Sequence, residues 1–228
     1  MNVVPIPGLA HLPYAEVWLD EAEDDVLAAA FDAARAIGKP GLEVWTTTRT
    51  PDVAHFLETR GFTEVRRYVI SELDVASAPD PGEPRFPLVT LAEQPHLAPQ
   101  LYELARVAYA DQPGRAETRI DDAWFEWGLR AHPPDSYFVA FEDGRVLGYG
   151  YLERDGQEWR NGFMAVAREA RGRGVASAIK CAQIRFAKTH GIATLRTANE
   201  ARLEGMLALN RRLGYRPLYE EVVLRSAT

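Results

Sequence analysis

The apolar residues of this chain follow two spacings, and each predicts a different kind of element. Short apolar runs at 137–141 and 146–152 flank Asp143-Gly144, a strong signal for the turn of a β-hairpin. After residue 174 the spacing becomes that of a helix with one buried side. The apolar residues of this stripe are Val175, Ala178, Ile179, Ala182 and Phe186.

The same pattern predicts alternating strands and helices along the second part of the chain. Pro99 falls in the first turn of one predicted helix, where its missing N–H costs nothing, and Gly191 and Gly214 follow two helix ends. Such an order predicts an α/β or α+β fold with a mixed sheet. The expected strands are 86–91, 137–141, 146–152, 159–166, 194–198 and 215–224, and the expected helices are 96–110, 121–130, 203–213 and one running from 175 to the cap at 191.

A change of composition divides the chain at residues 76–84, which hold three prolines and one glycine. This stretch predicts an extended linker. It separates a short first domain, residues 1–75, from a second domain, residues 85–228.

The first domain repeats the end of the second. Placing Gly61-Phe62 on Gly214-Tyr215 gives an offset of 153 (214 − 61), and under it Gly38 falls on Gly191 without a gap. A constant offset across a helix, a strand and a second helix predicts an internal duplication. The first copy is partial, because it lacks counterparts of everything before about residue 154.

A glycine-rich loop lies between a predicted strand and the helix that begins at residue 175. Gly172 and Gly174 allow close approach of the backbone, and Arg171 and Arg173 add positive charge. The free N–H groups and positive dipole of the following helix end favour an anion. The loop therefore predicts a site for a phosphate or a pyrophosphate.

The first copy carries acids where the second carries this loop. At the same offset Trp18 falls on Arg171 and Glu21 on Gly174, within a run, residues 20–25, that has five carboxylates in six positions. Such acids repel a pyrophosphate and instead complement a helix N-terminus. The first copy is therefore predicted to be degenerate, with one working site per chain.

Two motifs at matching distance make the second domain resemble the GNAT superfamily of acyl-CoA-dependent N-acyltransferases. The first is Val166-x4-Arg171-x2-Gly174-x-Ala176, and the second is Met206-x3-Asn210-x2-Leu-Gly-Tyr215. The resemblance covers about residues 86–226. The tandem arrangement with a degenerate first copy is similar to the mycothiol-synthase-like branch, although the first copy is short here.

The resemblance implies a GNAT fold, a mixed twisted sheet with flanking helices preceded by a partial GNAT-like half-domain, and acetyl-CoA as cosubstrate without a metal. Met164, Ala165 and Val166 would pair with the pantetheine arm. Asn199 and Asn210 would lie along the cofactor. The pyrophosphate loop would comprise Arg171, Gly172, Arg173, Gly174, Val175 and Ala176, with Ser177 just inside the helix.

The catalytic groups are less well marked than the cofactor loop. Many family members have a tyrosine acid where this chain has Asn210, and an amide cannot supply a proton at neutral pH. Arg160 stands at a position that carries a base in some relatives. Three residues remain as candidates: Glu158 and Glu153 as bases, and Tyr219 as an acid.

Aromatic residues before the hairpin have two interpretations. Trp124, Phe125 and Trp127 are expected to pack in the core, or to line the acceptor pocket with Tyr109 and Asp111. Cys181 is expected to be a buried, inert thiol.

Composition narrows the class of function. The net charge of −7 argues against nucleic acid as the main partner, and no segment is long and apolar enough to span a membrane. A single cysteine and an N-terminus without a basic, apolar leader predict a cytoplasmic protein. The five histidines show no metal-ligand spacing.

These observations lead to one main hypothesis and one alternative. The main hypothesis is an N-acetyltransferase that transfers an acetyl group directly from acetyl-CoA to a primary amine of a small molecule. The alternative is a non-catalytic acyl-CoA-binding sensor or regulatory module. The partial first copy has sheet edges to cover, so we expect it to pack on the second domain or on a second chain in a homodimer.

Overall fold

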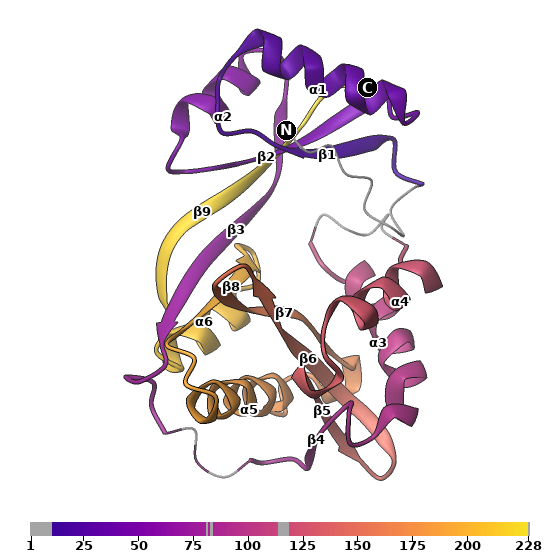
Figure 1. Cartoon of the computed structure of the whole chain (residues 1–228), viewed down its shortest axis with the longest axis vertical. Helices are drawn as coiled ribbons and strands as arrows, with labels where there is room; N and C mark the ends of the chain where they lie inside the picture. The colour runs from indigo at the N-terminus through magenta and orange to yellow at the C-terminus, as the bar shows by residue number, and fades with distance from the viewer. Residues whose placement is uncertain (1–10, 81, 83, 114–118, 228) are drawn as a thin grey trace.

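The structure is a computed structural model that describes residues 11–80, 82, 84–113 and 119–227. In these residues nine strands form one open, twisted sheet of order β1-β2-β9-β3-β8-β7-β6-β5-β4, which confirms the predicted mixed α/β fold (Figure 1). Two pairs, β1 with β2 and β7 with β8, are parallel, and the other pairs are antiparallel. The strands are β1 (Tyr14–Trp18), β2 (Gly41–Thr47), β3 (Thr63–Asp74), β4 (Leu88–Thr90), β5 (Tyr137–Glu142), β6 (Arg145–Asp155), β7 (Glu158–Val166), β8 (Thr194–Glu200) and β9 (Arg216–Arg225).

The helices lie where the apolar spacing predicts them. Pro99 is in the first turn of its helix, and the turn at Asp143-Gly144 has φ of 50° and 76°, the left-handed values that a tight hairpin requires. The α-helices are α1 (Asp24–Ala36), α2 (Pro51–Glu58), α3 (Ala98–Ala110), α4 (Asp122–Ala131), α5 (Val175–Thr189) and α6 (Glu204–Arg212), and the short 3₁₀ turns are η1 (Pro95–Leu97), η2 (Pro134–Ser136) and η3 (Arg168–Ala170).

Helices cover both faces of the sheet in the second part of the chain. Alternate residues of a strand point to opposite faces, so one strand contributes side chains to the core on each face. Phe138 and Ala140 of β5 pack in the cluster that includes Ile179 of α5. Tyr137 and Val139 of the same strand pack in a second cluster with residues of α3 and α4. In the first part of the chain α1 and α2 cover β1 and β2 (Figure 1).

The two parts of the chain exchange strands. Strand β3, from the first part, lies between β8 and β9 of the second part, and β9 in turn lies between β2 and β3. This pairing meets the expectation that the first part packs on the second. The chain on the two sides of residues 76–84 therefore shares one sheet and part of one core, in which Leu73 and Val75 pack near Leu195.

The offset of 153 holds for most of the elements that it relates. It places β2, residues 41–47, on β8, residues 194–200, and α2, residues 51–58, on 204–211 in α6. It fails at β1, however, so the prediction that Trp18 stands in the place of Arg171 is wrong. Trp18 ends a strand and lies opposite Trp45, and only residues 19–23 connect that strand to α1.

The acidic residues that follow this strand lie at the N-terminus of a helix, where negative charge is favourable. Asp24 and Asp25 lie in the first turn of α1, where carboxylates complement the helix dipole. Between β1 and α1, residues 19–23 contain no glycine and therefore do not repeat the glycine-rich loop.

Candidate functional site

A pocket opens where β7 and β8 separate. The two strands pair only at Arg160–Arg196 and Asn161–Thr197, and beyond this point no pairing joins them in the described residues. A bulge in β7, where the register with β6 shifts, bends the strand at this place. The resulting pocket has a volume of about 610 Å³ and is lined by both strands, the glycine-rich loop, α5 and α6.

The glycine-rich loop forms one end of this pocket. Gly172 and Gly174 have φ of 77° and 93°, which only glycine adopts without strain. The N–H of Ala178 donates to the Gly174 carbonyl, so the N–H groups of the first three residues of α5 precede the first helical bond. Free N–H groups and a positive dipole at a pocket mouth suit a phosphate or a pyrophosphate.

Two arginines near this loop, Arg168 and Arg171, form ion pairs with Asp111, the residue that follows the last turn of α3. Asp111 accepts hydrogen bonds from Arg168 and from Arg171, the second at 2.6 Å. The Arg168 guanidinium, and then that of Arg171, holds the pKa of Asp111 well below its usual range. Arg173 instead donates to Glu142 at 2.8 Å, outside the pocket lining. An incoming anion would therefore compete with Asp111 for Arg171.

The narrow end of the pocket is the end where β7 and β8 still pair, at Asn161 and Thr197. A buried network of polar side chains lies there. Asn161 donates to Gln183 at 2.8 Å and accepts a bond of 2.6 Å from the Tyr215 hydroxyl. Lys180 and Thr197 join the same network. Burial raises the pKa of Tyr215 well above its usual value, so this phenol keeps its proton.

The structure brings most of the predicted cofactor residues together. Ala165 points to the opposite face, into the core with α3, and Arg173 lies outside the lining. Asn210 is also outside it, and its amide donates to Asn199 at 2.5 Å. The predicted cofactor residues that line the pocket are Met164, Val166, Arg171, Gly172, Gly174, Val175, Ala176, Ser177 and Asn199.

The three predicted catalytic residues lie away from this lining. Glu158, at the start of β7, pairs with Arg160 and Arg196. Tyr219, on β9, has the guanidinium of Arg49 at 3.9 Å from its ring centre.

Glu153, on β6, differs from the other two in its surroundings. It lies 3.6 Å from Nε2 of His132, and burial raises the pKa of its carboxyl. Burial also lowers the pKa of His132, which favours the neutral ring. Of the three candidates, Glu153 is the carboxylate whose surroundings suit proton transfer near neutral pH.

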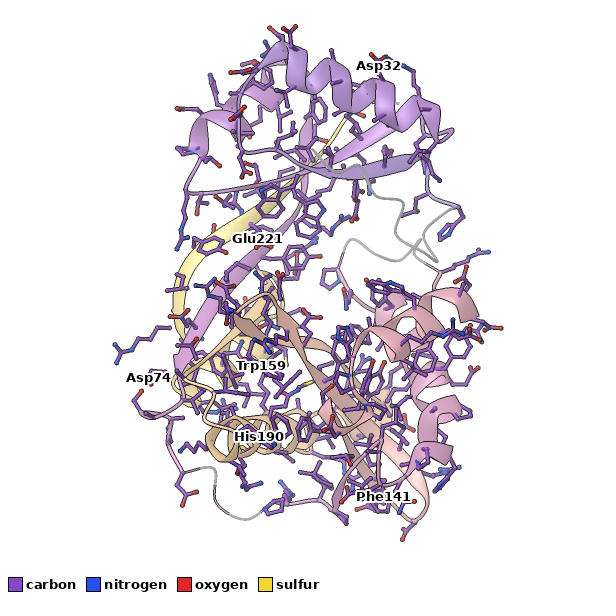
Figure 2. All side chains as sticks on the ribbon, in the orientation of Figure 1. Asp32, Asp74, Phe141, Trp159, His190 and Glu221 are labelled. Carbon is purple, nitrogen blue, oxygen red and sulfur yellow. The ribbon has the colours of Figure 1, made fainter. Side chains whose placement is uncertain are left out.

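The remaining sequence predictions have mixed outcomes. Phe125 is buried, whereas Trp127 is 53% exposed, and the side chain of Trp124 lies outside the described residues. Cys181 is buried and free, as predicted. His190, labelled in Figure 2, follows α5 directly before the predicted cap Gly191, and its Nδ1 lies 2.8 Å from the Phe186 carbonyl oxygen.

Several residues of the pocket and of the buried network beside it carry no motif in the sequence. Lys180 and Gln183 flank the apolar stripe of α5 and are both fully buried. Asn161 lies inside a strand, and the hydroxyl of Tyr215 reaches the site from a residue expected only to fill the core. A signal existed only for Lys180, since a lysine beside a buried stripe must find a partner inside the protein.

The sequence of the pocket region matches a known family. Residues 98–215, slightly more than half of the chain, match the sequence model of the Acetyltransferase (GNAT) family. The chain belongs to this family. No curated protein sequence matches this GNAT chain.

Solved structures share the fold of this GNAT protein at low sequence identity. A GCN5-related N-acetyltransferase from Sphaerobacter thermophilus is 16% identical, with a TM-score of 0.73 over 99% of this chain and 75% of that one. A tandem GNAT protein from the clavulanic acid biosynthesis pathway is 20% identical, with a TM-score of 0.69 over 95% and 75%. A GCN5-related N-acetyltransferase from Kribbella flavida is 18% identical, with a TM-score of 0.63 over 94% and 81%.

The described part of the chain lacks two further features. None of the helices there is both long and apolar enough to cross a membrane. The same part of the chain contains no group of three or more histidine, cysteine, aspartate or glutamate residues placed to hold a metal ion.

Proposed function

We propose that this GNAT protein is an N-acetyltransferase that transfers an acetyl group from acetyl-CoA directly to a primary amine of a small molecule. One observation carries the proposal: the open N-terminus of α5 and its glycine loop lie at one end of a pocket between two separating parallel strands. The loop suits the pyrophosphate, and the space between the strands suits an extended arm that ends in a thioester.

The residues present fit acetyl-CoA as a cosubstrate. The N–H groups of Val175, Ala176 and Ser177 would hold the pyrophosphate, and Arg171 would leave Asp111 to bind it. Met164 and Val166 of β7 line the pocket, and the edge of β7 that faces β8 has no β8 partner beyond Asn161 among the described residues. Such an edge favours an extended amide-bearing chain, which can hydrogen-bond to it like an added strand.

We propose Glu153 as the base that takes the proton of the acceptor amine, directly or through a water molecule. A carboxyl with a raised pKa is a better proton acceptor near neutral pH than one with an ordinary value. Glu158 and Tyr219 remain the other candidates, and both are held by charged neighbours. An acceptor with a cationic amine also suits a chain of net charge −7.

A second candidate function is an acyl-CoA-binding sensor without catalysis. It is favoured by Asn210, which stands where many relatives carry an acid and is bound to Asn199. Release of CoA thiol over a panel of amines separates the two functions. The enzyme hypothesis predicts amine-dependent thiol release, and tight acetyl-CoA binding with no turnover on any amine would support the sensor instead.

We further infer that residues 1–75 are a shortened, degenerate GNAT copy, joined by residues 76–84 to a catalytic domain, residues 85–228. The inference is supported by the matched elements β2 with β8 and α2 with α6 at a constant offset. The likeness to a solved tandem GNAT protein agrees with it. The mycothiol-synthase-like branch is the relative that this arrangement suggests, with a homodimer as a further possibility for covering sheet edges.

A further inference from the structure

A buried amine spans the point where the pocket begins. The Nζ atom of Lys180 lies 3.3 Å from Oδ1 of Asn161 on β7 and 3.3 Å from Oγ1 of Thr197 on β8. These two residues form the last register pair before the strands separate. Lys180 is also one of the residues that line the pocket.

No carboxylate among the described residues pairs with this amine. Lys180 is 1% exposed, both hydrogen-bond partners are neutral oxygens, and the ring centre of Tyr215 lies 4.8 Å away. Taking a cation out of water without a counter-charge is costly. Burial accordingly lowers the pKa of Lys180 to about 7, so the amine can gain and lose a proton near neutral pH.

The other ionisable groups of the pocket come from several elements. Asp111 is bound by Arg171, and Glu200 on β8 accepts from Arg202 at 2.5 Å. Tyr215 retains its proton and contacts Lys180 through its ring. The titratable or charged residues that line the pocket besides Lys180 are Tyr68, Asp111, Arg171, Glu200 and Arg212.

The position of Lys180 matches the reactive end of the proposed cosubstrate. Val166, the last residue of β7, adjoins the glycine loop, and Asn161 lies on the same strand at the narrow end of the pocket. The two residues are five positions apart, which corresponds to about 17 Å at 3.3 Å per residue. An extended chain that runs from the loop along this edge therefore ends beside Lys180. At Asn210, where many relatives carry an acid, this chain has an amide.

We propose that Lys180 is the acid that protonates the sulfur of CoA as it leaves, a role that rests on the proposed function. A bond forms between the acceptor nitrogen and the carbonyl carbon, and the carbon–sulfur bond breaks with its electron pair remaining on sulfur. Lys180 gives one proton from Nζ to this thiolate, which yields the thiol and a neutral amine. The proton lost by the acceptor nitrogen goes to the base, and Lys180 takes up a proton from solvent after the products leave.

The direction of this proton transfer is favourable. An ordinary thiol has a pKa of about 8.5, which is above that of the buried amine. The charge on Nζ would also stabilise the thiolate before the proton moves, because opposite charges attract strongly in a site with little water.

Nuclear magnetic resonance of the lysine side chains tests the proposal in the intact protein without turnover. The chain has three lysines, and Lys39 and Lys188 bind backbone carbonyls outside the pocket. With lysine labelled at the ε carbon, the Lys39→Arg and Lys188→Arg variants identify the Lys180 signal by elimination. Its titration is followed in the free protein, with desulfo-CoA, which lacks the sulfur, and with CoA oxidised to its sulfonate, which carries a negative charge at the sulfur position throughout the titration.

We expect the sulfonate of CoA to raise the titration midpoint of Lys180 by about one pH unit or more relative to desulfo-CoA, because only the sulfonate places a negative charge beside Nζ. Equal midpoints with the two ligands would overturn the proposal, while the binding itself would still support the proposed function. If neither ligand binds, both the proposed function and the role of Lys180 fail.

Turnover gives a second, independent test once an acceptor is known. Lys180→Met should lower kcat by about 10² or more and leave the KM for acetyl-CoA unchanged. It should also remove the fall of kcat that accompanies loss of the Lys180 proton as the pH rises. If Tyr68→Phe produces these changes and Lys180→Met does not, the acid is Tyr68 and the proposal is wrong.

Discussion

Asp111 is the residue that we expect to oppose anion binding at the loop most directly. Its carboxylate pairs with Arg168 and Arg171, and Asp111 also lines the pocket, so a bound pyrophosphate would lie near a negative charge and two arginines that already have a partner. Both effects oppose ligand binding. The ligand must therefore exchange one ion pair for another, which makes the net gain smaller than the number of arginines suggests.

Asp111→Asn should strengthen the binding of CoA by about 10-fold, because removing one like charge near a partly exposed site is worth about 1.4 kcal/mol. Titration calorimetry at low and moderate salt measures the change, which should shrink as salt increases. Glu142→Gln is the matched control, since Glu142 pairs with Arg173 outside the pocket lining. Weaker binding by Asp111→Asn would mean that Asp111 holds the loop in its binding conformation.

Glu153 provides a test of pH dependence. Its folded-state pKa is raised by burial, so the ionised carboxylate costs stability above that pKa, and the cost disappears below the pKa of the unfolded chain. Glu153→Gln should therefore raise Tm at pH 8 and change it little at pH 4. Glu158→Gln, which removes ion pairs with Arg160 and Arg196, should give no such increase. An equal Tm for wild type and Glu153→Gln at pH 8 would contradict the stated environment of Glu153.

At the scale of elements, the glycine-rich loop between β7 and α5 forms the end of the pocket where we propose that the anion binds. An acidic residue placed at the start of α5 would resemble the start of α1, whose first turn contains Asp24 and Asp25. Ala176 lines the pocket and lies in the first turn of α5. A carboxylate there complements the helix dipole, so it should repel the ligand without unfolding the protein.

Ala176→Glu should weaken acetyl-CoA binding by about 10³-fold, since two unit charges 4 Å apart at an effective dielectric constant of 20 repel by about 4 kcal/mol. Its Tm should equal or slightly exceed that of the wild type. Gln157→Glu adds the same charge on an exposed turn and should bind normally. Unchanged binding by Ala176→Glu would show that the pyrophosphate does not lie at this loop.

Gly162 shows how closely the bulge is fitted into the sheet. A Cβ atom at this position would lie 2.1 Å from the ring of Tyr151, so no larger residue fits without displacing that ring. The close approach of a ring to the backbone explains why this bulged stretch of β7 contains glycine.

The sequence predicted the loop better than the chemistry beyond it, and the reason is physical. Gly172, Gly174 and Ala176 are constrained by backbone conformation and by their place at a helix start, which leave a pattern in adjacent positions. The network at the narrow end joins Asn161 and Lys180 from different elements. Contacts of this kind depend on the tertiary fold, so no spacing in the sequence reveals them.

At the scale of the whole molecule, the exchange of β3 and β9 was also not predicted. Periodicity identifies a strand but not its neighbours, and the repeat suggested only that the two parts would pack together. In the structure β9 carries Val222 and Leu224 into the cluster beneath α1 and α2, while Leu73 of β3 enters the other core. Each part of the chain thus completes the core of the other.

This exchange predicts that the protein unfolds as one unit. The full chain should show a single thermal transition by circular dichroism. A fragment of residues 85–228 should lack that transition, because β8 loses β3 and β9 loses both of its neighbours. Adding a fragment of residues 1–80 should restore it. A fragment 85–228 that melts at the temperature of the full chain would contradict the account.

The central claim is that the pocket between β7 and β8 holds one acyl-CoA with its pyrophosphate at the loop before α5. Titration calorimetry of the full chain with acetyl-CoA tests this claim most directly. The account predicts saturable binding with one site per chain, lost in Ala176→Glu and kept in Gln157→Glu. No binding at millimolar acetyl-CoA, or binding with two sites per chain, would contradict it.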